Sequence, residues 1–149
     1  MIFLDVETQN FFTDAGGDGS YDHSDLKISF VGAYDNEKDM FMSFWEDDLK
    51  KLEAVVAEAG RVVGYNIWSF DYGVMASYMD IDLWTLPTLD LMEAMRKIVG
   101  FRPKLDNLAR ANDLGGKIGK GADAVEYWRK GDLEKLEKVL VDKDPNVRE

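Results

Sequence analysis

The chain has 149 residues, the length of one ordinary domain, and 46% of them are hydrophobic and 32% charged, as in folded globular proteins. It contains no Cys and a single His, His23, which excludes a disulfide framework, a thiol nucleophile and a metal site built from several His. The net charge of −11 at pH 7 argues at first against nucleic-acid binding. No apolar run is long enough to cross a membrane, and the first residues, MIFLDVET, lack the features of a secretory signal. We therefore expect one domain over 1–149, in the cytoplasm and without membrane contact.

The predicted elements begin with strands and end with helices. Strands are expected in five short apolar segments: 2–6, 26–34, 39–45, 61–65 and 84–89. Helices are expected in six segments: 46–59, 69–79, 90–99, 104–113, 121–130 and 132–141. Gly60 is expected to end the first helix and Ser69 to cap the start of the second. The polar segment 13–25 and the glycine-rich segment 115–121 are expected to be flexible loops.

The order of these elements predicts the fold class. An antiparallel hairpin comes first, strand–helix alternation follows, and helices fill the remainder. This order is typical of an α/β fold with a mixed central sheet, in which parallel strands are added to the hairpin and helices flank the sheet.

Two carboxylates stand on the first predicted strand. Asp5 and Glu7 are two residues apart, so their side chains face the same side of the strand. Two unpaired carboxylates on one face of a buried strand repel each other and are costly to desolvate. A divalent cation between them would relieve both costs, and Mg²⁺ and Mn²⁺ favour oxygen ligands. The alternative is that both residues lie solvated at the end of the strand.

A second polar group follows the fourth predicted strand. Asn66, Phe70 and Asp71 lie at a strand-to-helix corner, and the carboxyl ends of strands are where sites lie in α/β sheets. The alternative for Asp71 is a carboxylate that only stabilises the start of a helix.

The charges of the chain are unevenly distributed. Residues 1–80 carry 16 acids and 5 bases, whereas residues 96–130 carry nine bases and four acids, a local charge of +5. The basic stretch is either an ordinary solvated surface or an edge that binds phosphates beside an acidic metal site.

Together these segments resemble a known family. Asp5-Val6-Glu7-Thr8, followed by Gly64-Tyr65-Asn66 and Phe70-Asp71, resembles the first two motifs of the DEDD superfamily of 3′–5′ exonucleases. The nearest branch is the DEDDy branch related to the proofreading domains of B-family DNA polymerases. Further resemblance to that branch lies at 89–92, 104–109 and 124–131. The resemblance covers nearly the whole chain and implies an RNase H-like fold.

The resemblance also implies a mechanism and a set of site residues. Two Mg²⁺ or Mn²⁺ ions would be held by four carboxylates and would hydrolyse the terminal phosphodiester of a single-stranded nucleic acid, with DNA favoured. The implied catalytic and metal-binding residues are Asp5, Glu7, Asp71 and Asp142. The implied substrate-binding residues, which position the terminal nucleotide, stack on bases or orient the strand, are Thr8, Asn10, Phe11, Asn66, Trp68 and Phe70. A polymerase or a helicase is a candidate protein partner.

The third motif of that family, Y-x-x-x-D on a late helix, is not intact. Its Tyr orients or activates the attacking water, and its Asp completes the metal site; residues four apart share one helix face. Asp142 is the best candidate for the Asp, but Lys138 stands where the Tyr is expected. The chain ends seven residues after Asp142, which suggests a shortened form.

Three functional hypotheses follow. The first is an active metal-dependent exonuclease. The second is a degenerate module of the same fold that binds metal or nucleic-acid ends without turnover. The third is an unrelated α/β protein in which the acids coincide by chance.

Overall fold

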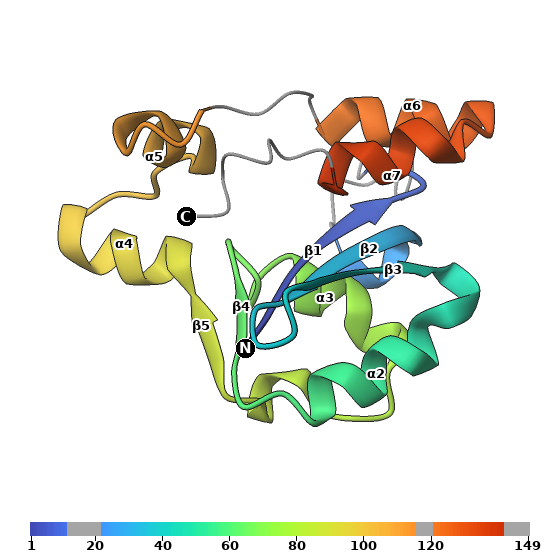
Figure 1. The fold of residues 1–149 in the computed structure, drawn as a ribbon, viewed down its shortest axis with the longest axis horizontal. Coiled ribbons are helices and arrows are strands. Elements are labelled where there is room, and N and C mark those ends of the chain that lie inside the picture. The colour runs from blue at the N-terminus through green and yellow to red at the C-terminus, as the bar shows by residue number, and fades with distance from the viewer. Residues whose placement is uncertain (12–21, 116–120, 142–149) are drawn as a thin grey trace.

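The computed structural model describes residues 1–11, 22–115 and 121–141, and its centre is a mixed five-stranded sheet (Figure 1). The strands are β1 (Ile2–Thr8), β2 (Ile28–Asp35), β3 (Met40–Trp45), β4 (Val62–Gly64) and β5 (Thr88–Asp90). Their order in the sheet is β3-β2-β1-β4-β5. The first three strands pair antiparallel, and β4 and β5 are added parallel to β1. The predicted α/β class with a mixed sheet is therefore confirmed.

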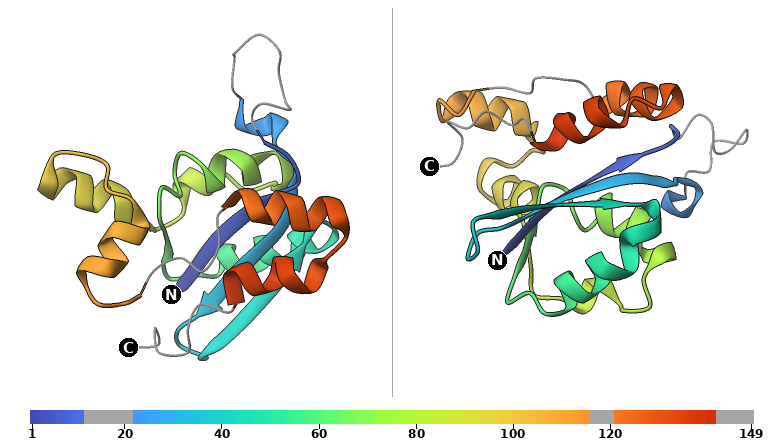
Figure 2. Two further views of the ribbon diagram at one scale, coloured as in Figure 1. Left: turned by 90° about the horizontal axis from the view of Figure 1, so that it is seen from above. Right: turned by 45° about the vertical axis from the view of Figure 1, so that its right-hand side comes forward.

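Helices cover both faces of this sheet, as the two views of Figure 2 show. The helices are α2 (Leu49–Ala57), α3 (Asp71–Met75), α4 (Leu91–Val99), α5 (Leu105–Ala111), α6 (Gly121–Lys130) and α7 (Leu133–Val141). One face carries α2 and α3, and the other carries α6 over β1 and α7 over β2. The helices α4 and α5 lie beyond the β5 edge (Figure 1). In the part of the chain that the structure describes, no helix has the length and apolarity needed to span a bilayer.

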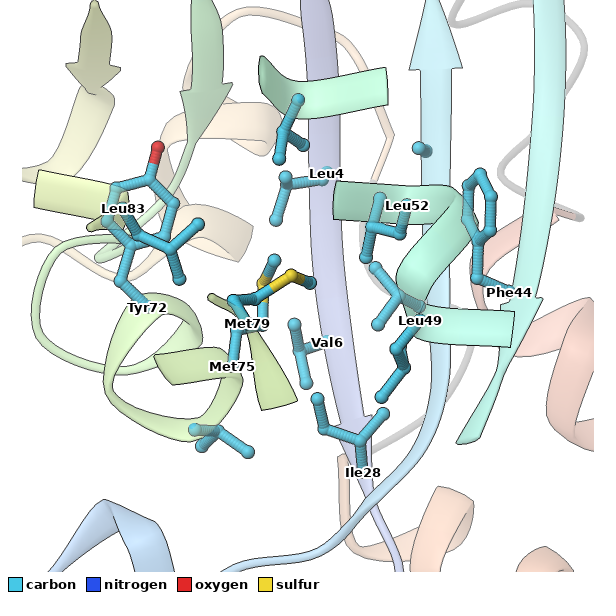
Figure 3. Close-up of a cluster of buried hydrophobic side chains, with 14 of the residues drawn as sticks. Leu4, Val6, Ile28, Phe44, Leu49, Leu52, Tyr72, Met75, Met79 and Leu83 are labelled. Atoms are coloured by element: carbon cyan, nitrogen blue, oxygen red, sulfur yellow. The ribbon is translucent and has the colours of Figure 1, made fainter. Parts of the chain in front are cut away.

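The main core lies between the sheet and the α2–α3 layer. Along β1, Ile2, Leu4 and Val6 are buried on this side, because alternate residues of a strand face the same way. Figure 3 shows side chains of β1, β2, β3, α2 and α3 meeting in this core, among them Leu4, Val6, Ile28, Phe44, Leu49, Leu52, Tyr72 and Met75. Burial of this set is the largest source of stability in the fold.

A smaller cluster joins the opposite face of the sheet to α6 and α7. Phe30 of β2 packs there against Ala124 and Leu136, with the partly buried rings of Trp45 and Tyr127 around them. This cluster fixes the two late helices over the sheet.

Several predicted boundaries differ from the observed ones. The predicted cap Ser69 is wrong: α3 starts at Asp71, its capping position is Phe70, and no side chain caps it. The backbone between β4 and α3 forms its own turn, in which the Phe70 N–H donates to the Asn66 carbonyl at 3.0 Å. The predicted strand 84–89 begins late, because residues 83–85 form a 3-10 helix capped by Asp82.

The helix predicted at 46–59 opens with a 3-10 turn at Glu46–Asp48 before α2. Most of the predicted loop 13–25 and residues 116–120 of the predicted loop 115–121 lie outside the described residues.

Candidate active site

The second face of β1 presents the two predicted carboxylates. Phe3, Asp5 and Glu7 alternate with the buried core residues, and Asp5 lies opposite Gly32 of β2 in the strand register. The helix α6 covers β1 on this face, and two of its residues, Ala122 and Val125, line a pocket together with both carboxylates.

A pocket of about 360 Å³ lies at this end of β1. It is lined by Asp5, Val6, Glu7, Thr8, Asn10, Phe11, Leu26, Phe70, Ala122 and Val125. Six of the ten predicted site residues therefore border one space: both carboxylates of β1, three residues that follow them and Phe70. Its volume falls within the range of small-ligand pockets.

Hydrogen bonds hold the chain at the pocket mouth in a defined shape. The Thr8 hydroxyl donates to the Asn10 carbonyl at 2.9 Å, and the Asn10 side chain accepts from the Lys27 N–H at 2.9 Å. The Gln9 side chain donates to the Ile28 carbonyl at 2.8 Å. These hydrogen bonds connect the segment 8–10 to the start of β2. The pocket residues Thr8 and Asn10 are therefore held in place by bonds to the backbone.

Asp71, the first residue of α3, lies against the backbone of β1. The ladder between β1 and β4 pairs only Ile2 and Phe3, so the Val6 N–H is left for the Asp71 carboxylate, to which it donates at 3.0 Å. The Asp71 side chain is buried, and its residue is only 3% exposed. Burial, and then the nearby charge of Asp5, raise the pKa of Asp71 well above its ordinary value of 3.8. The charge of Asp5 is therefore close enough to oppose the ionisation of Asp71.

Asp90 organises the loop that leads to Asp71, and sequence reasoning gave it no part in the site. Its buried carboxylate accepts the N–H groups of Asn66 at 3.0 Å and Trp68 at 3.2 Å. It also accepts the N–H groups of Met92 and Glu93 in the first turn of α4. An Asp at the start of a predicted helix, here the first residue of the expected helix 90–99, is a capping signal that the sequence contained.

Two predicted substrate-binding residues, Asn66 and Trp68, do not line the pocket. The backbone of Asn66 is left-handed, with φ of 62°, and its side-chain oxygen is buried without a hydrogen-bond partner. Trp68 is 38% exposed, and its carbonyl accepts from the indole N–H of Trp84 at 3.2 Å. The hydrogen bonds to Asp90 hold the backbone of residues 66–68 near the end of β5. Of the three predicted substrate-binding residues between β4 and α3, Phe70 alone lines the pocket.

The carboxylates fit a divalent cation in chemistry. They are hard oxygen donors, and a cation bound beside Asp5 and Asp71 would offset the burial and the repulsion that raise the pKa of Asp71. Within residues 1–11, 22–115 and 121–141, however, no three Asp, Glu or His side chains come close enough to hold one metal ion together. Asp142, the predicted fourth carboxylate, lies outside the described residues.

The basic stretch 96–130 is divided in space and partly neutralised. Its described residues lie in and around α4 and α5 beyond the sheet edge, and on α6 above β1. Four of its bases form ion pairs with carboxylates: Arg96 and Arg102 with Glu93, Arg110 with Asp106, and Lys130 with Glu126. The described residues of this stretch therefore do not form one continuous phosphate-binding edge.

Comparison with known families assigns this architecture. The family model of the RNase H superfamily, RNase_H_2, matches residues 2–141, and the chain belongs to this superfamily. The hypothesis of an unrelated α/β protein is therefore wrong. RNase H-like nucleases generally use divalent metal ions, and membership supports a nuclease function in general.

A solved structure of similar fold is the family B DNA polymerase from the hyperthermophilic archaeon Pyrobaculum calidifontis. The TM-score is 0.68 with 16% sequence identity over 95% of this chain. The chain spans 22% of the length of that polymerase, and the likeness concerns the fold. No curated protein matches the sequence.

Proposed function

We propose that the protein is a metal-dependent 3′–5′ exonuclease that acts on single-stranded nucleic acid, DNA being favoured. The observation that carries the proposal is that Asp5 and Glu7 line a pocket of about 360 Å³ at the end of β1, while the buried carboxylate of Asp71 accepts the Val6 N–H and lies near Asp5. Carboxylates gathered on a central strand are costly for folding unless a cation compensates them, so their presence favours a function that needs one.

Each residue has a part in this proposal. Asp5, Glu7 and Asp71 would hold Mg²⁺ or Mn²⁺, which when bound supplies a more acidic water and charge stabilisation at the scissile phosphate. The Val6 N–H fixes one oxygen of Asp71, which keeps that carboxylate turned toward β1. Phe11 and Phe70 form apolar walls of the pocket, against which a terminal base can pack while water is excluded.

The second candidate is a binding module that has lost turnover. It is favoured by Lys138, which stands on α7 where the third motif of the resembling family has its Tyr. Lys138 is exposed in the structure, as expected of an ordinary helix lysine. An exonuclease of this family would then lack the group that orients the attacking water.

Digestion of a 5′-labelled single strand separates the two candidates. DNA and RNA strands are incubated with Mg²⁺, Mn²⁺ or chelator, and the products are resolved by length. A ladder that shortens from the 3′ end only with metal is expected for the wild type. Asp5→Asn and Asp71→Asn should slow it at least about a hundredfold, because even the supporting partners of metal ligands are worth 10–100-fold.

Asp80→Asn is the matched control. Asp80 is exposed, pairs with Lys50 and lies beside α2 on the opposite face of the sheet, so its loss should leave the ladder unchanged. Absence of a wild-type ladder in both metals would refute turnover. Metal-induced stabilisation of that inactive protein would then favour the binding module.

A further inference from the structure

The two edges of the sheet differ in their capacity to pair with another strand. At one edge, β5 has only three residues, and α4 and α5 lie beyond it (Figure 1). At the other edge, β3 has six residues and pairs within the sheet with β2 alone. Short edge strands and covering helices are two of the ways in which proteins prevent pairing with a foreign chain. The β5 edge has both, whereas β3 is long enough to accept a further strand.

The strand β3 also lacks the residues that normally discourage pairing. Its sequence, MFMSFW, contains no charged residue and no Pro. Its ladder with β2 runs over all six residues without a bulge. Met40 and Phe41 are 43% and 42% exposed. Charged side chains, Pro and bulges are what natural edge strands use to avoid a partner, so β3 remains able to pair.

The backbone of β3 presents hydrogen-bonding groups outward. In an antiparallel pair, alternate residues direct their N–H and C=O groups to the partner strand, and the residues between them direct these groups away from it. Among the described residues, no hydrogen bond from outside the β2–β3 ladder is formed to the backbone of residues 40–44. An added strand would bond to these outward groups.

Acidic groups stand at both ends of this edge. Asp39 directly precedes β3, and Glu46 and Asp47 directly follow it. The other acids of the two flanking segments, at 35, 37 and 48, are already paired with cations. Among the described residues, Asp39, Glu46 and Asp47 form no ion pair. The edge is thus an apolar strand between two acidic ends.

This charge pattern decides which kind of strand fits. A second copy of β3, paired in either direction, would bring acidic ends together, and like charges opposite each other are destabilising. The net charge of −11 adds to the repulsion between copies. An extended peptide with Lys or Arg at its ends would instead meet opposite charges at both ends of the edge.

We propose that the β3 edge binds an extended segment of a partner protein, which joins the sheet as an additional strand and carries apolar residues between basic ends. The backbone ladder would provide affinity, and the end charges would select the partner. The inference goes beyond the proposed function, because β2 separates β3 from β1 and no β3 residue lines the pocket.

Binding of a synthetic peptide tests both the charge and the strand geometry. The probe is a fluorescent peptide of alternating Val and Thr, as long as β3, with Lys at both ends, and its anisotropy is followed as protein is added. One control peptide has Glu ends, and another keeps the Lys ends but has Pro at its centre. Both controls should bind at least about tenfold more weakly, because the first meets like charges and the second lacks a ladder donor.

Variants of the protein locate the binding site. Asp47→Asn should weaken binding of the Lys-ended peptide about two- to fivefold at low salt, the range of an exposed ion pair, and the difference should shrink at high salt. Asp113→Asn is the matched control, since Asp113 is exposed and follows α5 beyond the β5 edge, and it should leave the affinity unchanged. Phe41→Lys should weaken binding even of a peptide with uncharged ends, because a Lys on an edge strand opposes pairing.

Hydrogen exchange distinguishes an added strand from loose association. The outward amides of β3 should exchange readily in the free protein, at a rate independent of protein concentration, and the Lys-ended peptide should protect them. Three results would each overturn the proposal: no binding of that peptide at low salt, equal binding of the Lys-ended and Glu-ended peptides, or binding without protection of β3.

A second copy on the edge is also detected. Protection of β3 that grows with protein concentration in the absence of peptide, together with a dimer in sedimentation, would show that another copy occupies the edge and would overturn the assignment to a basic partner. The digestion ladder tests the proposed function separately, so failure of either proposal leaves the other to its own experiment.

Discussion

The two faces of the sheet are built on different principles, although they share the same strands. On the α2–α3 face, β1 contributes Leu4 and Val6 to a continuous apolar core. On the α6–α7 face, the intervening residues Asp5 and Glu7 border a pocket, and the apolar cluster there is small. The twofold alternation of a strand thus lets one segment supply stability on one side and charge on the other. The free energy of burial in the large apolar core offsets the desolvation and repulsion of the carboxylates on the opposite face.

The largest effect expected on stability is in the apolar face. Leu52 of α2 is fully buried in the main core, and Leu52→Ala should lower the free energy of unfolding by about 2–5 kcal/mol through lost burial and a residual cavity. Denaturant unfolding measures this change. Leu136→Ala, in the smaller cluster, is the comparison and should cost less. Equal losses would show that the two faces contribute alike.

A smaller effect is expected from pH on the charged face. The pKa of Asp71 is raised in the folded protein, so the folded state holds more protons than the unfolded state above pH 3.8. In chelator, the free energy of unfolding should therefore fall as pH rises from about 3.8 through the raised pKa, and Asp71→Asn should remove this fall. Thermal melts at stepped pH measure it.

Carboxylates with a lowered pKa cannot produce this fall. Asp22, Asp35 and Asp132 have lowered pKa values because hydrogen bonds favour their charged forms. Their contribution is present above their ordinary pKa and is lost as pH falls, which is the opposite direction. A stability that rises with pH between 4 and 7 in chelator would contradict the assignment to Asp71.

The smallest effect on stability is expected from removing only the repulsion between Asp5 and Asp71. Asp5→Asn leaves Asp71 buried and takes away the second cause of its raised pKa, so the metal-free protein should become more stable by about 1 kcal/mol. Millimolar Mn²⁺ should reverse the order, because the wild type binds it more tightly and is stabilised more. The two melting temperatures, with chelator and with Mn²⁺, are the measurement. A variant that melts lower than the wild type in chelator would remove the support for clustered carboxylates.

Local patterns were sufficient to predict which face of β1 the candidate site residues share. The spacing of Asp5 and Glu7 determines their shared face, and the strand-to-helix corner placed Phe70 and Asp71 near them. The order of strands and helices similarly predicted a mixed sheet, since a hairpin and parallel additions leave few arrangements.

The remaining features depend on contacts between distant residues. Asn66 and Trp68 were expected at the pocket because they are close to Phe70 in sequence, but hydrogen bonds to Asp90 hold their backbone elsewhere. Arg129 and Phe11 meet across most of the chain, and only a local excess of bases marked that region. The sequence around Phe11 does not indicate that Arg129 will contact it, and the sequence around Arg129 does not indicate Phe11.

The carboxylate of Asp90 also has a consequence for local unfolding. It accepts N–H groups from two segments, Asn66 and Trp68 before α3, and Met92 and Glu93 at the start of α4. One side chain thus supports both segments, and we expect loss of the Asp90 carboxylate to weaken the loop before α3 and the first turn of α4 together.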